Sequence, residues 1–178
     1  QVERQRVPAH EAYVRHMRRS LDYRQGRHVP PDEEFVEALL ALEAPAFVAT
    51  MLLLDAAAAW RRGDAPVALQ RMHVVIEAWA SGGRELFWSF ARVFEVFLGG
   101  NPLTSHELAQ IRGTVAAGSV PGVQAQIVTL MHHLGLCDEH ERRTWVGRLA
   151  ESEYPATARR ELLSLVEMDN GWEGGDQS

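Results

Sequence analysis

Apolar residues recur at three- and four-residue spacing along almost the whole chain, and sustained alternation of apolar and polar residues is nearly absent. Such spacing places apolar side chains on one face of an α-helix, whereas a half-buried β-strand requires alternation. Stretches with glycine or proline, such as GGNP and AGSVPG, interrupt the pattern at short intervals. The sequence therefore predicts an all-α fold of about eight or nine short helices, packed as successive antiparallel hairpins in a solenoid-like or irregular bundle.

The breaks and caps give approximate helix positions. We expect helices over about 8–24, 45–62, 65–80 and 84–98, and one that starts at the N-cap Asp32, ahead of the apolar residues Phe35, Val36, Leu39 and Leu40. Thr104 with Glu107 predicts a capping box. Later helices follow from the stripes Val123, Ile127, Leu130, Met131 and Leu134; Trp145, Val146 and Leu149; and Leu162, Leu163, Val166 and Met168.

The length of 178 residues and the apolar content of 46% fit one domain, expected over 1–169 with a basic arm over about 1–28 and a disordered tail at 170–178. The longest apolar run, 44–60, is short for a membrane span and carries Asp55 at its centre, so we interpret it as a buried helix. Asp55 then faces a loop, pairs with an arginine or serves as a buried functional acid.

One cysteine cannot form an internal disulfide, which favours the cytoplasm, although a start at Gln1 leaves a targeting segment open.

All 18 basic residues are arginine, which is typical of a GC-rich bacterial genome. The absence of lysine excludes a P-loop, a Schiff base and an S-x-x-K pair. H-E-x-x-H, E-x-x-H, G-x-G-x-x-G and G-x-S-x-G are absent too. We therefore expect neither an enzyme nor a cofactor.

The stretch MHHLGLCDEHER, residues 131–142, has two interpretations. Gly135 suits the left-handed position after a helix that ends near His133, and Asp138 suits an N-cap with Glu141 three residues later. Alternatively, His133, Cys137 and His140 have the ligand types of a zinc site, with His132, Glu139 or Glu141 as the fourth. The spacing H-x3-C-x2-H is unusual for zinc, so we predict a structural turn and keep the metal site as the minority alternative.

Residues 56–79, AAAAWRRGDAPVALQRMHVVIEAW, carry a turn at Gly63 and Asp64, a small residue at Ala68, and the apolar positions Leu69, Met72 and Ile76. This segment resembles a single tetratricopeptide-type helical hairpin, and the resemblance does not extend over the whole chain. Asp55 stands where that hairpin has a leucine, Ala59 replaces an aromatic residue, and the closing proline is absent at Ala80. The resemblance implies a protein-binding surface.

The first 28 residues carry a net charge of +4, which leaves −10 for the rest because the whole chain carries −6. The arm's arginines are Arg4, Arg6, Arg15, Arg18, Arg19, Arg24 and Arg27. With Tyr13 and Tyr23 they suit single-stranded nucleic acid, bound through residues 4–27. The alternative is a helix that docks on the acidic body through Val14, Met17 and Leu21, the stripe that also includes Tyr13.

By exclusion, the sequence favours a non-enzymatic helical module for protein–protein interaction, an adaptor or subunit of a larger assembly. The alternative is an accessory subunit of a nucleoprotein complex that uses the arginine-rich arm. A further possibility is a small-molecule pocket lined by Phe87, Trp88, Phe90, Phe94 and Phe97, although aromatic stripes at helical spacing usually form core. We expect another protein as the partner and no membrane, and the oligomeric state stays open.

Overall fold

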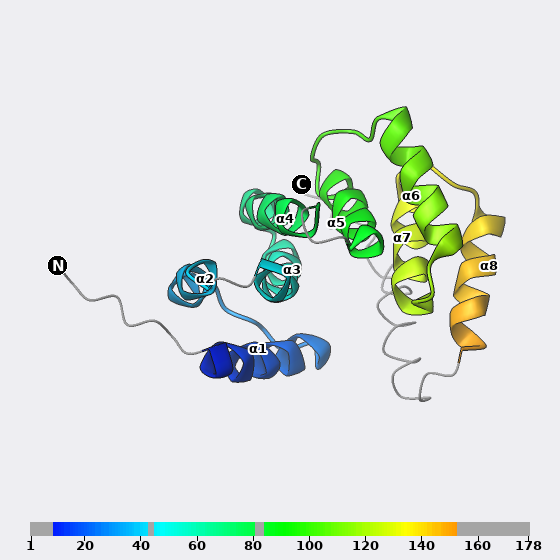
Figure 1. Cartoon of the computed structure of the whole chain (residues 1–178). Helices are drawn as coiled ribbons and strands as arrows, with labels where there is room; N and C mark the ends of the chain where they lie inside the picture. The colour runs from blue at the N-terminus through cyan, green and yellow to red at the C-terminus, as the bar shows by residue number, and fades with distance from the viewer. Residues whose placement is uncertain (1–8, 43–44, 81–83, 153–178) are drawn as a thin grey trace, which may run out of the picture. The chain divides into compact units, whose positions relative to one another are not determined.

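The computed structural model of the chain describes residues 9–42, 45–80 and 84–152. Eight α-helices and no β-strand occur within these ranges, which confirms the all-α prediction (Figure 1). The chain divides after Pro102 into two compact units. The expected helix around Leu162 to Met168 and the tail at 170–178 lie outside the described residues, and the single domain over 1–169 stays a prediction.

The first unit contains five helices: α1 (Ala9–Arg24), α2 (Glu33–Leu40), α3 (Pro45–Arg61), α4 (Ala65–Ala80) and α5 (Glu85–Phe97). Pro45 opens α3, where the first helical turn tolerates its missing N–H. Asp32 caps α2 as predicted, because its Oδ1 accepts from the backbone N–H of Phe35 at 3.2 Å.

A tight turn joins α3 to α4 and makes them an antiparallel pair. Gly63 adopts φ of +82°, a left-handed conformation that residues with a Cβ rarely adopt. The side chain of Asp64 accepts from the backbone N–H of Val67 at 3.3 Å and so begins α4. Fully buried alanines let the two helices approach closely: Ala56 and Ala59 on α3, and Ala68 on α4.

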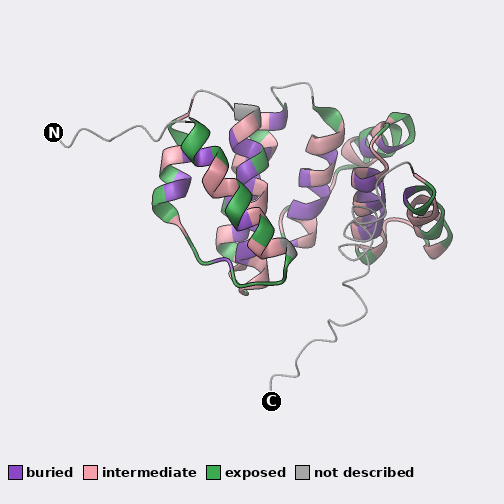
Figure 2. Ribbon diagram, turned by 90° about the horizontal axis from the view of Figure 1, so that it is seen from below, coloured by how far each residue is buried: buried purple, intermediate pink, exposed green. Residues whose placement is uncertain are grey.

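The core of the first unit takes buried apolar residues from α2, α3, α4 and α5, and Figure 2 shows buried positions along the helices. Aromatic rings of α5 pack against tryptophans of the preceding helices. The Trp60 ring centroid lies 5.3 Å from that of Phe97 and 6.1 Å from that of Phe94, and the Trp79 centroid lies 5.6 Å from that of Phe87. These residues of the aromatic stripe therefore contribute to packing.

The second unit contains α6 (Ser105–Ala117), α7 (Pro121–His133) and α8 (Glu139–Ala150). The predicted capping box is confirmed: Thr104 Oγ1 accepts from the N–H of Glu107 at 3.2 Å, and Glu107 Oε2 accepts from the N–H of Thr104 at 2.8 Å. Gln124 of α7 donates from Nε2 to the carbonyls of Val115 at 2.6 Å and Gly118 at 3.0 Å, which ties α7 to the end of α6.

None of the described helices is both long enough and apolar enough to cross a membrane.

Candidate functional site

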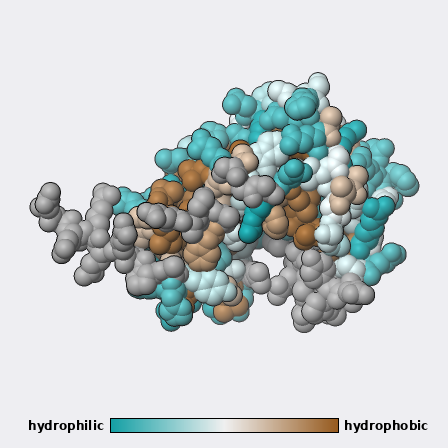
Figure 3. All heavy atoms as spheres, viewed as in Figure 1, coloured by the Kyte–Doolittle hydropathy of each residue, from teal (hydrophilic) through white to brown (hydrophobic). Residues whose placement is uncertain are grey.

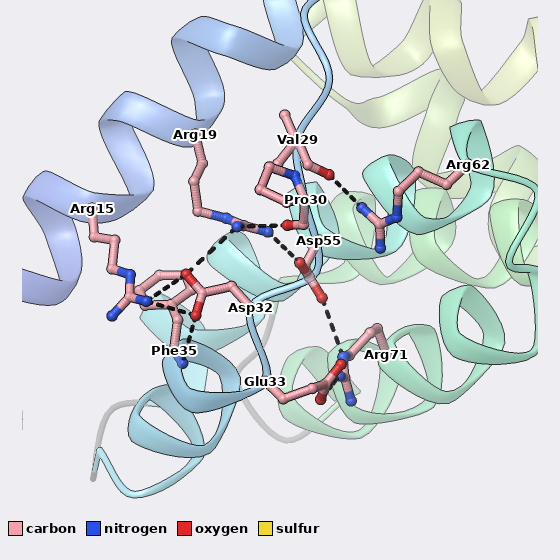
Figure 4. Close-up of polar contacts among 10 residues, drawn as sticks. All are labelled: Arg15, Arg19, Val29, Pro30, Asp32, Glu33, Phe35, Asp55, Arg62 and Arg71. Atoms are coloured by element: carbon pink, nitrogen blue, oxygen red, sulfur yellow. Dashed lines mark hydrogen bonds and ion pairs between the residues drawn. The ribbon is translucent and has the colours of Figure 1, made fainter.

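A buried carboxylate on α3, that of Asp55, organises the first unit. Arg19 of α1 donates from Nη2 to Oδ1 at 2.6 Å, and Arg71 of α4 donates from Nε to Oδ2 at 3.2 Å (Figure 4). Asp55 is 3% exposed and the two arginines are also buried. Because an unpaired charge is costly to bury, Asp55 requires these partners. Pairing with an arginine, one of the three predicted environments for Asp55, is therefore what the structure shows.

The ion pairs extend from Asp55 to two acids at the start of α2, Asp32 and Glu33. Arg15 contacts Asp32, with Nη2 at 2.6 Å from Oδ1, and Arg19 Nη1 lies 3.6 Å from the other oxygen of Asp32. Arg71 also pairs with Glu33. Four helices therefore share one network of arginines and carboxylates, which we call the Asp55 network; its members are Arg15, Arg19, Asp32, Glu33, Asp55 and Arg71 (Figure 4).

The Asp55 network fixes how α1 is rotated about its axis. Among the residues of α1 whose burial the structure describes, Ala12 and Arg19 are buried, and Arg19 also donates from Nη1 to the carbonyl of Pro30 at 3.0 Å. The face of α1 that carries Arg19 is therefore turned inward. Of the three residues predicted to dock α1, Met17 and Leu21 are exposed and Val14 is half-buried, because the buried acid on α3 draws Arg19 inward.

The outward face of α1 is apolar as a result. Tyr13, Met17 and Leu21 follow one another at four-residue intervals and are 47%, 50% and 53% exposed; we call them the α1 stripe. Leu40 in the last turn of α2 is 51% exposed, and α2 packs beside α1. Figure 3 shows apolar surface over α2. Exposed apolar side chains that share one helix face are typical of an interaction surface.

The arginines predicted to bind a partner or nucleic acid have different environments. Arg4 and Arg6 lie outside the described residues, and Arg24 lies in the last turn of α1. Arg18 is exposed, whereas Arg27 pairs with Asp22 at 3.1 Å. Arg15 and Arg19 belong to the Asp55 network. A guanidinium that already bonds a carboxylate contributes less to phosphate binding, so this arrangement does not favour a phosphate-binding surface on α1.

The structure places MHHLGLCDEHER at the turn between α7 and α8. Gly135 has φ of +68°, its N–H donates to the carbonyl of His132 at 2.9 Å, and the N–H of Leu136 donates to that of Met131 at 2.8 Å. This pair of hydrogen bonds is a Schellman motif. Asp138 Oδ1 accepts from the N–H of Glu141 at 2.8 Å and caps α8. The predicted turn is confirmed.

Residues proposed as zinc ligands do not converge at this turn. Within the described ranges, no three His, Cys, Asp or Glu side chains are close enough to hold a metal ion. Cys137 Sγ instead donates to the carbonyl of Val128 at 3.4 Å. Burial, followed by the charge of Glu141, raises the pKa of the Cys137 thiol to about 11. The thiol is therefore held in its protonated form.

A second polar cluster, which the sequence did not indicate, lies between α4 and α5. His73 Nε2 is 2.8 Å from Oε1 of Glu95, whose other oxygen contacts Arg92, and both Arg92 and Glu95 are buried. Arg92 Nη2 also donates to the carbonyls of Asn101 at 3.3 Å and Pro102 at 3.4 Å. The cluster borders an open hollow of about 360 Å³ lined by His73, Ile76, Glu77, Arg92, Glu95 and Asn101.

This cluster holds the end of α5. The N–H of Gly100 donates to the carbonyl of Glu95 at 2.9 Å, and a Cβ at Gly100 would lie 2.7 Å from Cγ of Glu95. Arg92 and Glu95 thus fasten the turn at 99–102 to the helix. His73 and Glu95 are 22 positions apart and on different helices, so no local motif reveals their pairing. The interactions identify a structural role for the cluster.

Comparison of the chain with protein-family models, with curated proteins and with solved structures gives no match.

Proposed function

We propose that the chain is a non-enzymatic helical module that binds another protein through the outward face of α1. The observation that supports this proposal is the exposure of Tyr13, Met17 and Leu21 on one side of a helix whose arginine side is buried. A helix that packs on its own domain normally turns its apolar side inward. Here the buried ion pair of Arg19 with Asp55 reverses that preference, and the apolar side stays available for a partner.

The single cysteine keeps the cytoplasm as the proposed compartment. The resemblance of residues 56–79 to a tetratricopeptide-type hairpin is consistent with a protein-binding role, and it too remains a proposal. The Asp55 network engages Arg15 and Arg19 with carboxylates and buries Arg19. An exposed apolar surface is therefore a better supported binding site than a phosphate-binding arm.

Affinity capture from the native host tests this function with three forms of the full chain. The first is wild type, the second carries M17S and L21S, and the third is a matched control with A109S and Q110S at exposed positions of α6. Each apolar side chain contributes roughly 1–2 kcal/mol when its exposed half is buried, so we expect M17S/L21S to reduce partner recovery at least tenfold. The control should recover the partner as wild type does.

Two results would contradict the proposal. Equal recovery by wild type and by M17S/L21S would remove the α1 stripe as the binding surface. Recovery of nucleic acid that depends on salt and falls with R18A would instead favour the nucleoprotein alternative. R18A is the suitable variant to test nucleic-acid binding, because Arg18 is exposed whereas Arg19 is buried in the Asp55 network.

A further inference from the structure

The charged residues beside the α1 stripe are arranged for pairing with an identical helix. Glu11 and Arg18 are both exposed and lie on the same flank of the outward face. Within the described residues, neither side chain forms a hydrogen bond or an ion pair. They are seven residues apart, about 10 Å along the helix axis, and therefore do not pair within one α1.

We propose that the partner of this face is α1 of a second copy of the chain, packed antiparallel about a two-fold axis. This inference rests on the proposed function and names its partner. If the axis passes between Val14 and Met17, Val14 of one copy packs against Met17 of the other. His10 then meets Leu21 of the second copy, so the residues of the outward face fill both sides of the seam.

The antiparallel arrangement also pairs the two charges. With the axis between Val14 and Met17, Glu11 of one copy lies within two positions, about 3 Å along the axis, of Arg18 of the other, and the two-fold axis repeats this pair. A parallel arrangement sets each residue at the level of its own counterpart, which keeps Glu11 and Arg18 about 10 Å apart along the axis. Only the antiparallel pair therefore satisfies both charges, and charges flanking an apolar seam commonly determine helix orientation.

The rotation of α1 is what makes this pairing possible. Arg19, with Asp55, holds the opposite side of the helix. Tyr13 at the edge of the face stacks on Phe47 of α3, with ring centroids 6.2 Å apart, while Met17 and Leu21 stay half exposed. One helix face per copy is small beside the roughly 1,200–2,000 Å² of a standard interface. The dimer is therefore weak and reversible, and its population depends on protein concentration.

Sedimentation velocity over a concentration series tests the pairing with the full chain. Wild type should shift from its monomer mass of 19.9 kDa toward twice that mass as concentration rises. E11R and R18E each place like charges opposite one another, so each variant alone should dissociate at least tenfold more readily. The double variant E11R/R18E and an equimolar mixture of the two single variants both restore opposite charges and should restore the dimer.

Each outcome distinguishes this inference from the proposed function. A wild-type chain that stays monomeric at every concentration overturns the self-pairing, while capture of a different protein through the same face would still support the interaction module. A dimer that E11R and R18E leave unchanged overturns the antiparallel α1 pairing. An equimolar mixture of E11R and R18E that does not associate also overturns this pairing. Thermal unfolding of each variant alone checks that these exposed substitutions leave the fold intact.

Discussion

Arg19 and Asp55 meet at 2.6 Å inside the first unit, although 36 positions separate them in the sequence. Their side chains are 10% and 3% exposed, so water screens the pair poorly. Asp55 also bonds Arg71, which means that one carboxylate holds α1 and α4 against α3. This contact therefore helps to determine which side of α1 faces the core.

We expect replacement of Asp55 by leucine to destabilise the protein, although leucine is the more apolar residue. D55L leaves Arg19 and Arg71 buried without this carboxylate, and removal of one member of a buried ion pair costs about 3–5 kcal/mol. The double variant D55L/R19M also removes the buried charge of Arg19. It should recover much of the lost free energy of unfolding, since Arg71 keeps its ion pair with Glu33. Denaturant unfolding of both variants gives the comparison.

The exposed pair of Arg27 with Asp22 supplies a matched control. R27A removes an ion pair whose two side chains are 65% and 42% exposed, and it should change the free energy of unfolding by less than about 1 kcal/mol. If D55L unfolds as wild type does, then the Asp55 network does not hold α1 in place.

The parts of the fold that the sequence predicted are those with local signals. The side chains of Asp32, Thr104 and Asp138 each accept from the backbone N–H three residues later and so cap the helix that follows. Gly135 lies just after the end of α7. Each of these interactions is complete within one turn of chain. Helix positions therefore followed from short stretches of sequence, and the structure confirms the eight helices whose residues it describes.

The rotation of α1 could not be predicted in the same way. Its apolar stripe predicted an inward face, and nothing within α1 indicates that Arg19 is to meet Asp55. The acid inside an apolar helix was the available signal, because a buried carboxylate requires a cation. The sequence does not identify which of the 18 arginines pairs with Asp55. The candidate surface was missed for this reason, as was the pairing of His73 with Glu95.

Gly135 and Gly147 form a matched pair for the turn between α7 and α8. G135A places a Cβ on a residue with φ of +68°, and we expect a loss of about 1 kcal/mol in the free energy of unfolding. G147A lies within α8, where an added Cβ meets nothing within 4 Å, so it should stabilise the protein by up to about 1 kcal/mol. Opposite shifts in the denaturation midpoint would support the Schellman turn; shifts of the same sign would contradict it.

Cys137 should react slowly with alkylating reagents in the folded protein. Burial raises the pKa of its thiol from 9.0 to about 11, so the reactive thiolate is about 100-fold scarcer near neutral pH. The folded state binds this proton more tightly, and its contribution to stability, complete below pH 9, is lost as pH rises toward 11. Iodoacetamide labelling against pH, followed by mass spectrometry, should show a midpoint near 11. A midpoint below 9 would contradict the burial of the thiol.

Glu139 should titrate in strong acid. Hydrogen bonds from Arg142 at 2.7 Å and Arg143 at 2.7 Å lower the pKa of its carboxyl to about 2. Because the folded-state pKa is lowered, the contribution to stability is complete above pH 4.5 and is lost as pH falls toward 2. Carboxyl NMR of wild type and of R142A/R143A checks this. The variant's pKa should return toward 4.5, and identical titrations would remove the arginines as the cause.

Met17 oxidation tests the rotation of α1 directly. Met17 is 50% exposed, whereas Met51, Met72 and Met131 are buried, so dilute hydrogen peroxide should convert Met17 to its sulfoxide well before these three. Peptide mass spectrometry over a time course gives the oxidation rates, and unfolding in urea supplies the control in which all four methionines react alike.

At concentrations that favour the proposed dimer, the seam covers Met17, so the oxidation rate of Met17 should fall. E11R should prevent that protection. A Met17 rate equal to that of Met72 in dilute folded protein would mean that the stripe faces the core, as the spacing of α1 alone predicts.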